Sequence, residues 1–116
     1  TVPALLMGAA SADVPAIMLV TGPMLAGSFR GERIGACTDC RRFWARYRAG
    51  EIDDATVEAA NSELAPTVGT CSVMGTASTM ALAVEALGMM LPGAASAPAV
   101  SAERRRLAEQ TGARAV

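Results

Sequence analysis

Hydrophobic and polar positions along this chain form blocks that predict several helices and one buried strand. The order Thr1-Val2-Pro3 followed by apolar and small residues is typical of a helix that runs to about Ala10, because Thr can cap and Pro fits the first turn. Residues 14–20 are an uninterrupted apolar run, which predicts a strand buried on both faces. Residues 21–37 are rich in glycine and predict a long loop with room for a hairpin.

The rest of the chain predicts further helices that start at polar caps and stop at glycine or proline. Thr38 and Asp39 are expected to cap the first of these, and Asp53 or Asp54 the second. The helix ranges are 38–49, 55–64, 73–89 and 101–110, the last one ended by Gly112. Residues 113–116 resemble the beginning of a second strand. The pattern therefore predicts an α/β protein of which this stretch is the mainly helical part.

Composition limits the size and the filling of the core. The chain has 116 residues, of which 52% are hydrophobic, 18% charged and only 3% aromatic. This length suits one domain or a piece of one. A core made of Ala, Val, Leu and Met favours closely packed helices over a β-sandwich.

The charged residues exclude several kinds of chemistry. The net charge is −1, every basic residue is arginine, and there is no lysine or histidine. The chain therefore supplies no imidazole for proton transfer and no Schiff-base lysine. Its charge balance argues against nucleic-acid binding. Arg104, Arg105 and Arg106 are interpreted as the solvated face of a helix.

Targeting signals are not recognisable in the sequence. The first residues lack a charged n-region, and the apolar runs are too short or interrupted for a membrane span. Three cysteines in such a chain indicate a reducing, cytoplasmic setting and thiol or metal chemistry.

Cys71 has the most distinctive surroundings, in the stretch PTVGTCSVMGTASTM. Gly69 and Gly75 allow positive φ or a close approach of a ligand. A helix starting near Val73 would favour a thiolate at Cys71, which a metal or redox partner requires. Nearby hydroxyls are available for capping, on Thr70, Ser72, Thr76 and Ser78. The alternative is a buried cysteine that acts as a small hydrophobic residue.

Two other stretches leave their interpretation open. Cys37-Thr38-Asp39-Cys40 suits a redox dithiol, half of a zinc site or two incidental thiols. Gly22-Pro23-Met24 suits an anion-binding backbone nest or ordinary turns. A small thiol-redox or metal-binding module using Cys37, Cys40 and Cys71 is therefore an alternative function, and a non-catalytic helical interaction domain is another.

Two long stretches resemble the dihydroxy-acid and sugar-acid dehydratase family. They are TVPALLMGAASADVPAIMLVTGPMLAG and PTVGTCSVMGTASTMALAVEALGMMLPGAASAPAV. The stretch IGACTDCRRFWARYRAGEID is more similar to the aldonic-acid branch, of arabinonate or xylonate type. The resemblance implies that residues 1–116 are an internal fragment of the N-terminal iron–sulfur and magnesium domain, without the C-terminal domain. That domain is expected to have three layers around a mostly parallel sheet.

The resemblance also implies an activity, its cofactors and one site residue. Such enzymes dehydrate a 2,3-dihydroxy acid to a 2-keto-3-deoxy acid. An iron–sulfur cluster, [2Fe–2S] in the sugar-acid branch, acts as a Lewis acid on the 3-hydroxyl. Mg²⁺ is held by acidic residues and a carbamylated lysine, and a serine of the C-terminal domain takes the C2 proton. Cys71 matches the third cluster cysteine, whereas Cys37 and Cys40 match no cluster position. The fragment alone is expected to be inactive, and the full-length enzyme to be a homo-oligomer.

Overall fold

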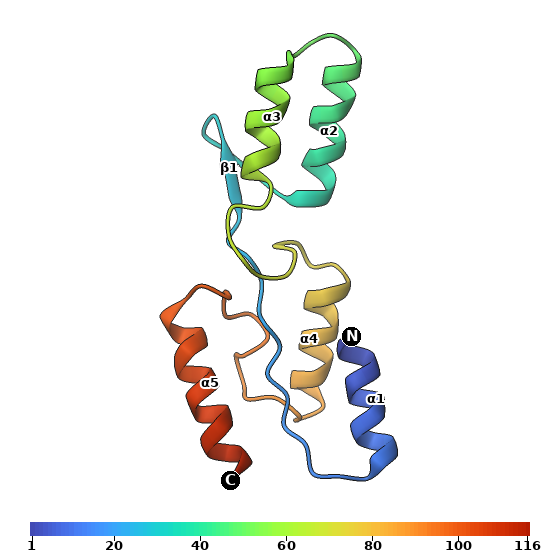
Figure 1. Ribbon diagram of the computed structural model, residues 1–116, viewed down its shortest axis with the longest axis vertical. Helices are drawn as coiled ribbons and strands as arrows, with labels where there is room; N and C mark the ends of the chain where they lie inside the picture. Colours follow the sequence, from blue (N-terminus) through green and yellow to red (C-terminus); the bar gives the residue numbers. More distant parts are fainter.

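The computed structural model describes residues 1–116 as five helices and one β-hairpin (Figure 1). The helices are α1 (Val2–Ala12), α2 (Ala36–Arg48), α3 (Asp54–Glu63), α4 (Thr76–Ala86) and α5 (Ala102–Ala115), and the strands are β1 (Gly27–Phe29) and β2 (Glu32–Ile34). The structure is mainly helical, as predicted, and the glycine-rich loop contains the expected hairpin. None of the helices has the length and hydrophobicity needed to cross a lipid bilayer.

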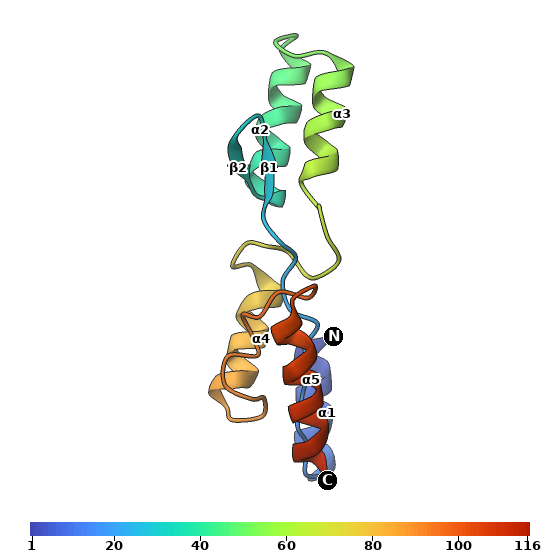
Figure 2. The ribbon, with the colours of Figure 1, turned by 90° about the vertical axis from the view of Figure 1, so that its left-hand side faces the viewer.

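The molecule is elongated and divides into two regions along its long axis (Figures 1 and 2). The hairpin region comprises residues 27–64, and the small-residue region comprises the remaining residues, with α1, α4 and α5. The extents are 56 × 29 × 17 Å and the radius of gyration is 17.6 Å, against about 13 Å for a compact domain of this length. The accessible surface of 7355 Å² also exceeds the value of about 5,900 Å² expected for this mass. The chain therefore covers less of its surface than a compact domain does.

The hairpin region has an aromatic core built from consecutive elements. The antiparallel strands pair Gly27 with Ile34 and Phe29 with Glu32. Phe29 and Phe43 meet edge to face, with ring centroids 5.4 Å apart. The buried members of this core come from β2, α2 and α3 and are Ile34, Phe43, Val57, Ala60 and Leu64. At the start of α3 the Asp53 carboxylate accepts a bond from Thr56 N at 2.9 Å, which confirms Asp53 as the cap.

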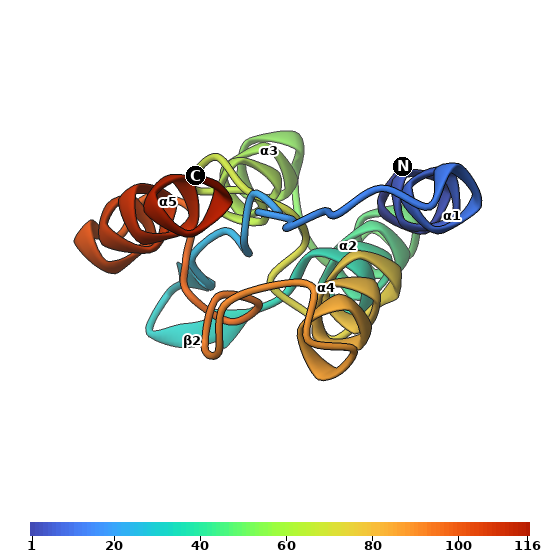
Figure 3. The ribbon, with the colours of Figure 1, turned by 90° about the horizontal axis from the view of Figure 1, so that it is seen from below.

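The small-residue region has a core of alanines, valines and a few larger aliphatic residues. Residues 14–25 run between α5 on one side and the α1–α4 pair on the other (Figure 3). The buried members are Val20, Ala81, Val84, Met90, Ala94, Ala95, Ala97 and Leu107. Helix α1 contributes none of its residues to the fully buried set, and Leu5 and Met7 are 65% and 68% exposed. This core joins segments that are far apart in the sequence.

The strands predicted at residues 14–20 and 113–116 do not form. Residues 14–20 are extended but unpaired as a strand, and only Val20 among them is buried. A strand needs a hydrogen-bonded neighbour along its length. This run instead makes an isolated backbone hydrogen bond, in which Met18 N donates to Met89 O at 2.7 Å. Residues 113–115 belong to α5. Gly112 is exposed and lies within this helix instead of ending it.

Several predicted helix boundaries also need correction. Helix α2 begins at Ala36 with Gly35 as N-cap, so Thr38 and Asp39 do not cap it. Helix α4 is shorter than the predicted range 73–89, because Gly75 caps its start and Gly88, with φ +76°, follows its end. The only regular sheet is the two-stranded antiparallel hairpin, supplemented by a single parallel bridge between Pro23 and Thr70.

Candidate functional site

The loop that carries Cys71 belongs to the small-residue region and lies at its junction with the hairpin region, where the chain passes from α3 to α4 (Figure 1). Cys71 is exposed and forms no disulfide. Helix α4 begins at Thr76 instead of near Val73, so residues 72–75 separate the thiol from the helix N-terminus. Cys71 therefore does not lie at the start of the helix as predicted. The alternative of a buried cysteine is also wrong for this chain, because the thiol is exposed.

Hydroxyl groups around Cys71 bond to carbonyl oxygens instead of capping α4. Thr70 Oγ1 donates to Gly22 O at 3.3 Å, and Ser78 Oγ donates to Val73 O at 3.4 Å. The N-cap of α4 is Gly75, which has no side chain to offer and whose φ of −104° is open to any residue. The expected side-chain caps are therefore wrong, and Gly75 does not adopt the positive φ that glycine permits.

Backbone pairing fixes the peptide that precedes Cys71. Thr70 N donates to Gly22 O at 2.9 Å, and Met24 N donates to Thr70 O at 2.8 Å. Gly69 has φ +134°, and a Cβ built there would lie 2.4 Å from Met24 N. Only glycine allows this approach. The positive φ predicted for Gly69 is confirmed, and the neighbour that it approaches closely is backbone. Met24 N is occupied by this pairing, which argues against an anion-binding nest at Gly22–Met24.

A third segment joins the other side of the Gly22–Met24 strip. Ala99 N donates to Pro23 O at 2.9 Å. A hollow of about 240 Å³ lies beside this junction, next to the Cys71 loop. Its lining combines serine hydroxyls with apolar side chains and consists of Pro23, Ser72, Met74, Ser78, Leu82, Ala95 and Ser96. No pattern in the sequence identifies Ala95 and Ser96 as part of this lining, because they meet the loop only through the tertiary fold.

Arg104 was predicted to be solvated, but it is buried with only 7% of its surface exposed, whereas Arg105 and Arg106 are exposed. Its guanidinium donates to three backbone carbonyls, those of Val20, Ala94 and Ala97, at 2.6–2.7 Å. Burial lowers the pKa of Arg104 from its ordinary value, and the charge of Glu103 opposes this shift. Sequence spacing could not separate this arginine from its two neighbours, since all three occupy one polar run.

The three cysteines are free and do not form a shared site. Cys37 is exposed in the first turn of α2, and Cys40 packs at the edge of the aromatic core. Nowhere in the chain do three or more Cys, Asp or Glu side chains gather closely enough to hold a metal ion. Cys71 fits a cluster as a single accessible thiol on a fixed backbone, and further ligands have to come from elsewhere. The carboxylates here do not form a magnesium site.

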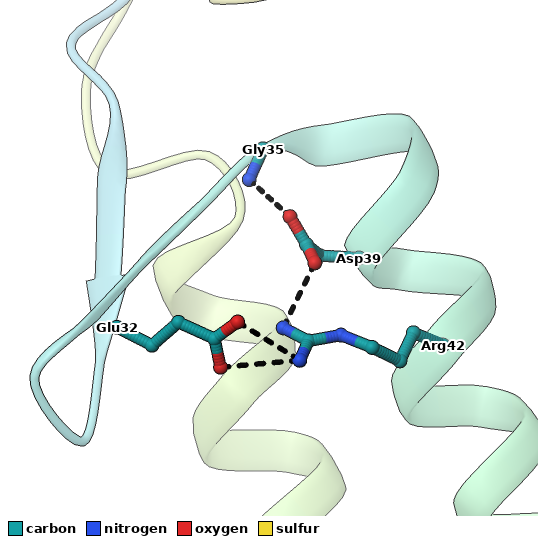
Figure 4. A network of polar contacts seen from close by, with 4 residues as sticks. All are labelled: Glu32, Gly35, Asp39 and Arg42. Atoms are coloured by element: carbon teal, nitrogen blue, oxygen red, sulfur yellow. Dashed lines mark hydrogen bonds and ion pairs between the residues drawn. The ribbon is translucent and has the colours of Figure 1, made fainter.

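A polar network fixes the start of α2 (Figure 4). Arg42 Nη1 lies 2.9 Å from Glu32 Oε1, and Arg42 Nη2 lies 2.9 Å from Asp39 Oδ1. Asp39 Oδ2 accepts a bond from Gly35 N at 2.6 Å. The hydrogen bond to Glu32 is the main cause that raises the pKa of Arg42. A Cβ built on Gly35 would lie 3.1 Å from Val73 Cγ1, so this end of α2 lies beside the Cys71 loop. The spacing of Asp39 and Arg42 could have predicted their pairing, but not the contribution of Glu32.

Comparisons with known proteins agree over the whole chain. The family model described as "Dihydroxy-acid/6-phosphogluconate dehydratase N-terminal" matches residues 1–116. An L-arabinonate dehydratase of Rhizobium leguminosarum is 49% identical over 116 residues. A dihydroxy-acid dehydratase of Thermodesulfovibrio yellowstonii is 45% identical over 114 residues, and a 6-deoxy-6-sulfo-D-gluconate dehydratase of Pseudomonas putida is 43% identical over 110 residues. These matches cover 95–100% of this chain but only 19–21% of the relatives, so the chain spans about a fifth of their length.

Proposed function

Because this chain belongs to the dihydroxy-acid/6-phosphogluconate dehydratase family, we propose that it is part of the N-terminal domain of a longer hydro-lyase. The proposed reaction removes the 3-hydroxyl of a 2,3-dihydroxy acid as water together with the C2 proton. The resulting enol rearranges to a 2-keto-3-deoxy acid. The similarity to relatives named for arabinonate and sulfogluconate supports a sugar acid as substrate. We further propose a cytoplasmic homo-oligomer, and a three-layer domain completed by chain beyond these residues.

The observation that carries this proposal is the accessibility and fixed position of Cys71, in a chain that matches the family over its whole length. Its thiol is exposed, unpaired by any disulfide, and attached to a backbone that Thr70 fixes on both sides through Gly22 and Met24. A thiolate ligand needs this combination of access and fixed position. A bound iron–sulfur cluster, of [2Fe–2S] type in this proposal, supplies a Lewis acid for the leaving hydroxyl.

The residues of this chain contribute position and shielding in this scheme. Gly69 brings the loop against Met24 without a side chain between them. The exposed apolar surface of α1 and of Met74, which is 69% exposed, is available for the rest of the domain to cover and thereby exclude water. Proton transfer at C2 and the Mg²⁺ ligands are assigned to other segments, because this chain has no histidine or lysine and no carboxylate cluster.

The alternative function as a thiol-redox or metal module receives less support. Cys37, Cys40 and Cys71 remain free, and they do not gather into a group that could hold a metal. Cys40 instead packs beside the aromatic core, which suits an incidental thiol.

The test is the substitution Cys71→Ser in the full-length protein, with Cys37→Ser as a matched control. We expect Cys71→Ser to lose the visible absorption and the iron and sulfide of the cluster, and dehydratase activity to fall to background. Cys37→Ser should retain both, because its side chain lies on the first turn of α2 and matches no cluster position. Normal cluster content in Cys71→Ser would rule out this assignment.

A further inference from the structure

Arg104 occupies an unusual position for a charged residue. It lies in the first turns of α5 with 7% of its surface exposed, and none of its bonds goes to a carboxylate. Its Nε is buried without any hydrogen-bond partner. Burying a charge without a counter-ion is costly. An aliphatic residue would avoid that cost, so the guanidinium must supply something that an aliphatic side chain cannot.

What it supplies is a rigid set of donors for irregular backbone. Nη1 donates to Val20 O at 2.7 Å, and Nη2 donates to Ala94 O at 2.6 Å and to Ala97 O at 2.7 Å. None of these carbonyls belongs to a helix or strand, so each would otherwise lack a regular partner. The planar guanidinium can reach all three at once. Arg104 thus joins two segments that are about 75 residues apart in the chain, as a neighbouring strand would.

The same contacts continue to the Cys71 loop. Gly22 lies directly against Arg104, because a Cβ at this position would be 2.3 Å from Nη2 and 2.3 Å from Ala97 O. Gly22 O in turn accepts the bond from Thr70 N, the residue before Cys71. Ala99 N, two residues after Ala97, bonds to Pro23 O on the same strip. A continuous path of short contacts therefore links the guanidinium to the peptide that carries the thiol.

We propose that Arg104 is a positioning residue for Cys71. It fixes residues 20–24 between the segment of Ala94 and Ala97 and the Cys71 loop, and residues 20–24 in turn fix the backbone of that loop. The part of this proposal that concerns cluster binding rests on the proposed function. The part that concerns the loop backbone does not, and it can be measured in the apoprotein.

The experiment compares Arg104→Met, Arg104→Lys and Arg105→Met in the full-length protein. Arg105→Met is the matched control, because Arg105 is the exposed neighbour on the same helix. Amide hydrogen exchange is followed in peptides that cover residues 20–24, 67–72 and 36–48. We expect Arg104→Met to speed exchange in the first two by at least about tenfold, since bonds to a charged donor are lost. Exchange in α2 of Arg104→Met should stay at the wild-type rate. In Arg105→Met, exchange should stay at the wild-type rate in all three peptides.

Two further readouts make the result specific. Alkylation of Cys71 by iodoacetamide in the apoprotein should change in rate with Arg104→Met, and the visible absorption of the reconstituted cluster should fall or shift. Arg104→Lys should restore only part of the protection, because an ammonium cannot match the guanidinium fork; it also replaces the methionine variant if that variant does not fold.

Unchanged exchange in residues 67–72 of a folded Arg104 variant would overturn the positioning role. Faster exchange in these residues, together with an absence of any cluster in both wild type and variant, would support the positioning role and overturn the proposed function instead.

Discussion

The two regions of this molecule reach stability in different ways. The hairpin region packs an aromatic core from a continuous stretch, residues 27–64, and closes it with exposed ion pairs such as Arg42–Glu32. The small-residue region packs alanines and valines from residues 20 to 107 and is joined by backbone bonds and by the buried Arg104. Both regions contain a glycine that backbone approaches closely, Gly27 beside Glu63 O in the first and Gly22 and Gly69 in the second. They differ in the size of the buried side chains and in the distance along the sequence between the segments that meet.

The candidate site lies in the small-residue region, where backbone segments from distant parts of the sequence approach closely. Closely approaching backbones leave carbonyl and amide groups that must be paired, and the pairing holds the Cys71 loop at a defined place.

The largest expected effect is on the hairpin region alone. Phe43→Ala removes a ring that is 4% exposed and in edge contact with Phe29, which should cost about 3–5 kcal/mol of local stability. Native-state hydrogen exchange in the full-length protein should show this loss in α2 and α3, with α5 unaffected. An equal loss in α5 would mean that the two regions unfold as one.

An intermediate effect is expected from Gly22→Ala. Gly22 has φ +87°, and a Cβ there would meet Ala97 O and Arg104 Nη2. Backbone strain and overpacking together should therefore lower the free energy of unfolding by about 3 kcal/mol. Gly31→Ala is the matched control in the hairpin turn, with φ +82° and open space around it, and its backbone strain alone should cost about 1–2 kcal/mol. Exchange in residues 67–72 should increase only for Gly22→Ala. Equal costs for both variants would show that close approach contributes nothing.

The smallest expected effect concerns one helix cap. Ser101 Oγ accepts a bond from Arg104 N at 3.1 Å, so Ser101→Ala should destabilise α5 by about 1 kcal/mol. Ser62→Ala is the control, because Ser62 bonds back to Glu58 O within α3 and its loss should change stability by less than about 0.5 kcal/mol. Hydrogen exchange of the first amides of α5 distinguishes the two variants, because it should become faster in Ser101→Ala and stay unchanged in Ser62→Ala. A similar result for both would mean that the Ser101 cap is not needed.

Local patterns predicted much of the hairpin region. The cap at Asp53, the hairpin and the helices on either side of it follow from residue preferences within a few positions. The strand predicted at residues 14–20 is wrong because an apolar run cannot show whether a pairing neighbour exists. The helix end predicted at Gly112 is wrong because glycine on an exposed helix face costs only about 1 kcal/mol and need not end a helix.

The sequence by itself determined the family, through long matching stretches, and identified Cys71 as the residue of interest within them. It also determined that the chain lacks histidine and lysine and so cannot supply their chemistry. Only the tertiary structure decided that Arg104 is buried while Arg105 is exposed, and that Gly22, Thr70 and Ala97 meet. The physical reason is that burial and backbone pairing between distant segments depend on which surfaces pack together, and a periodic pattern records only the preferences of near neighbours.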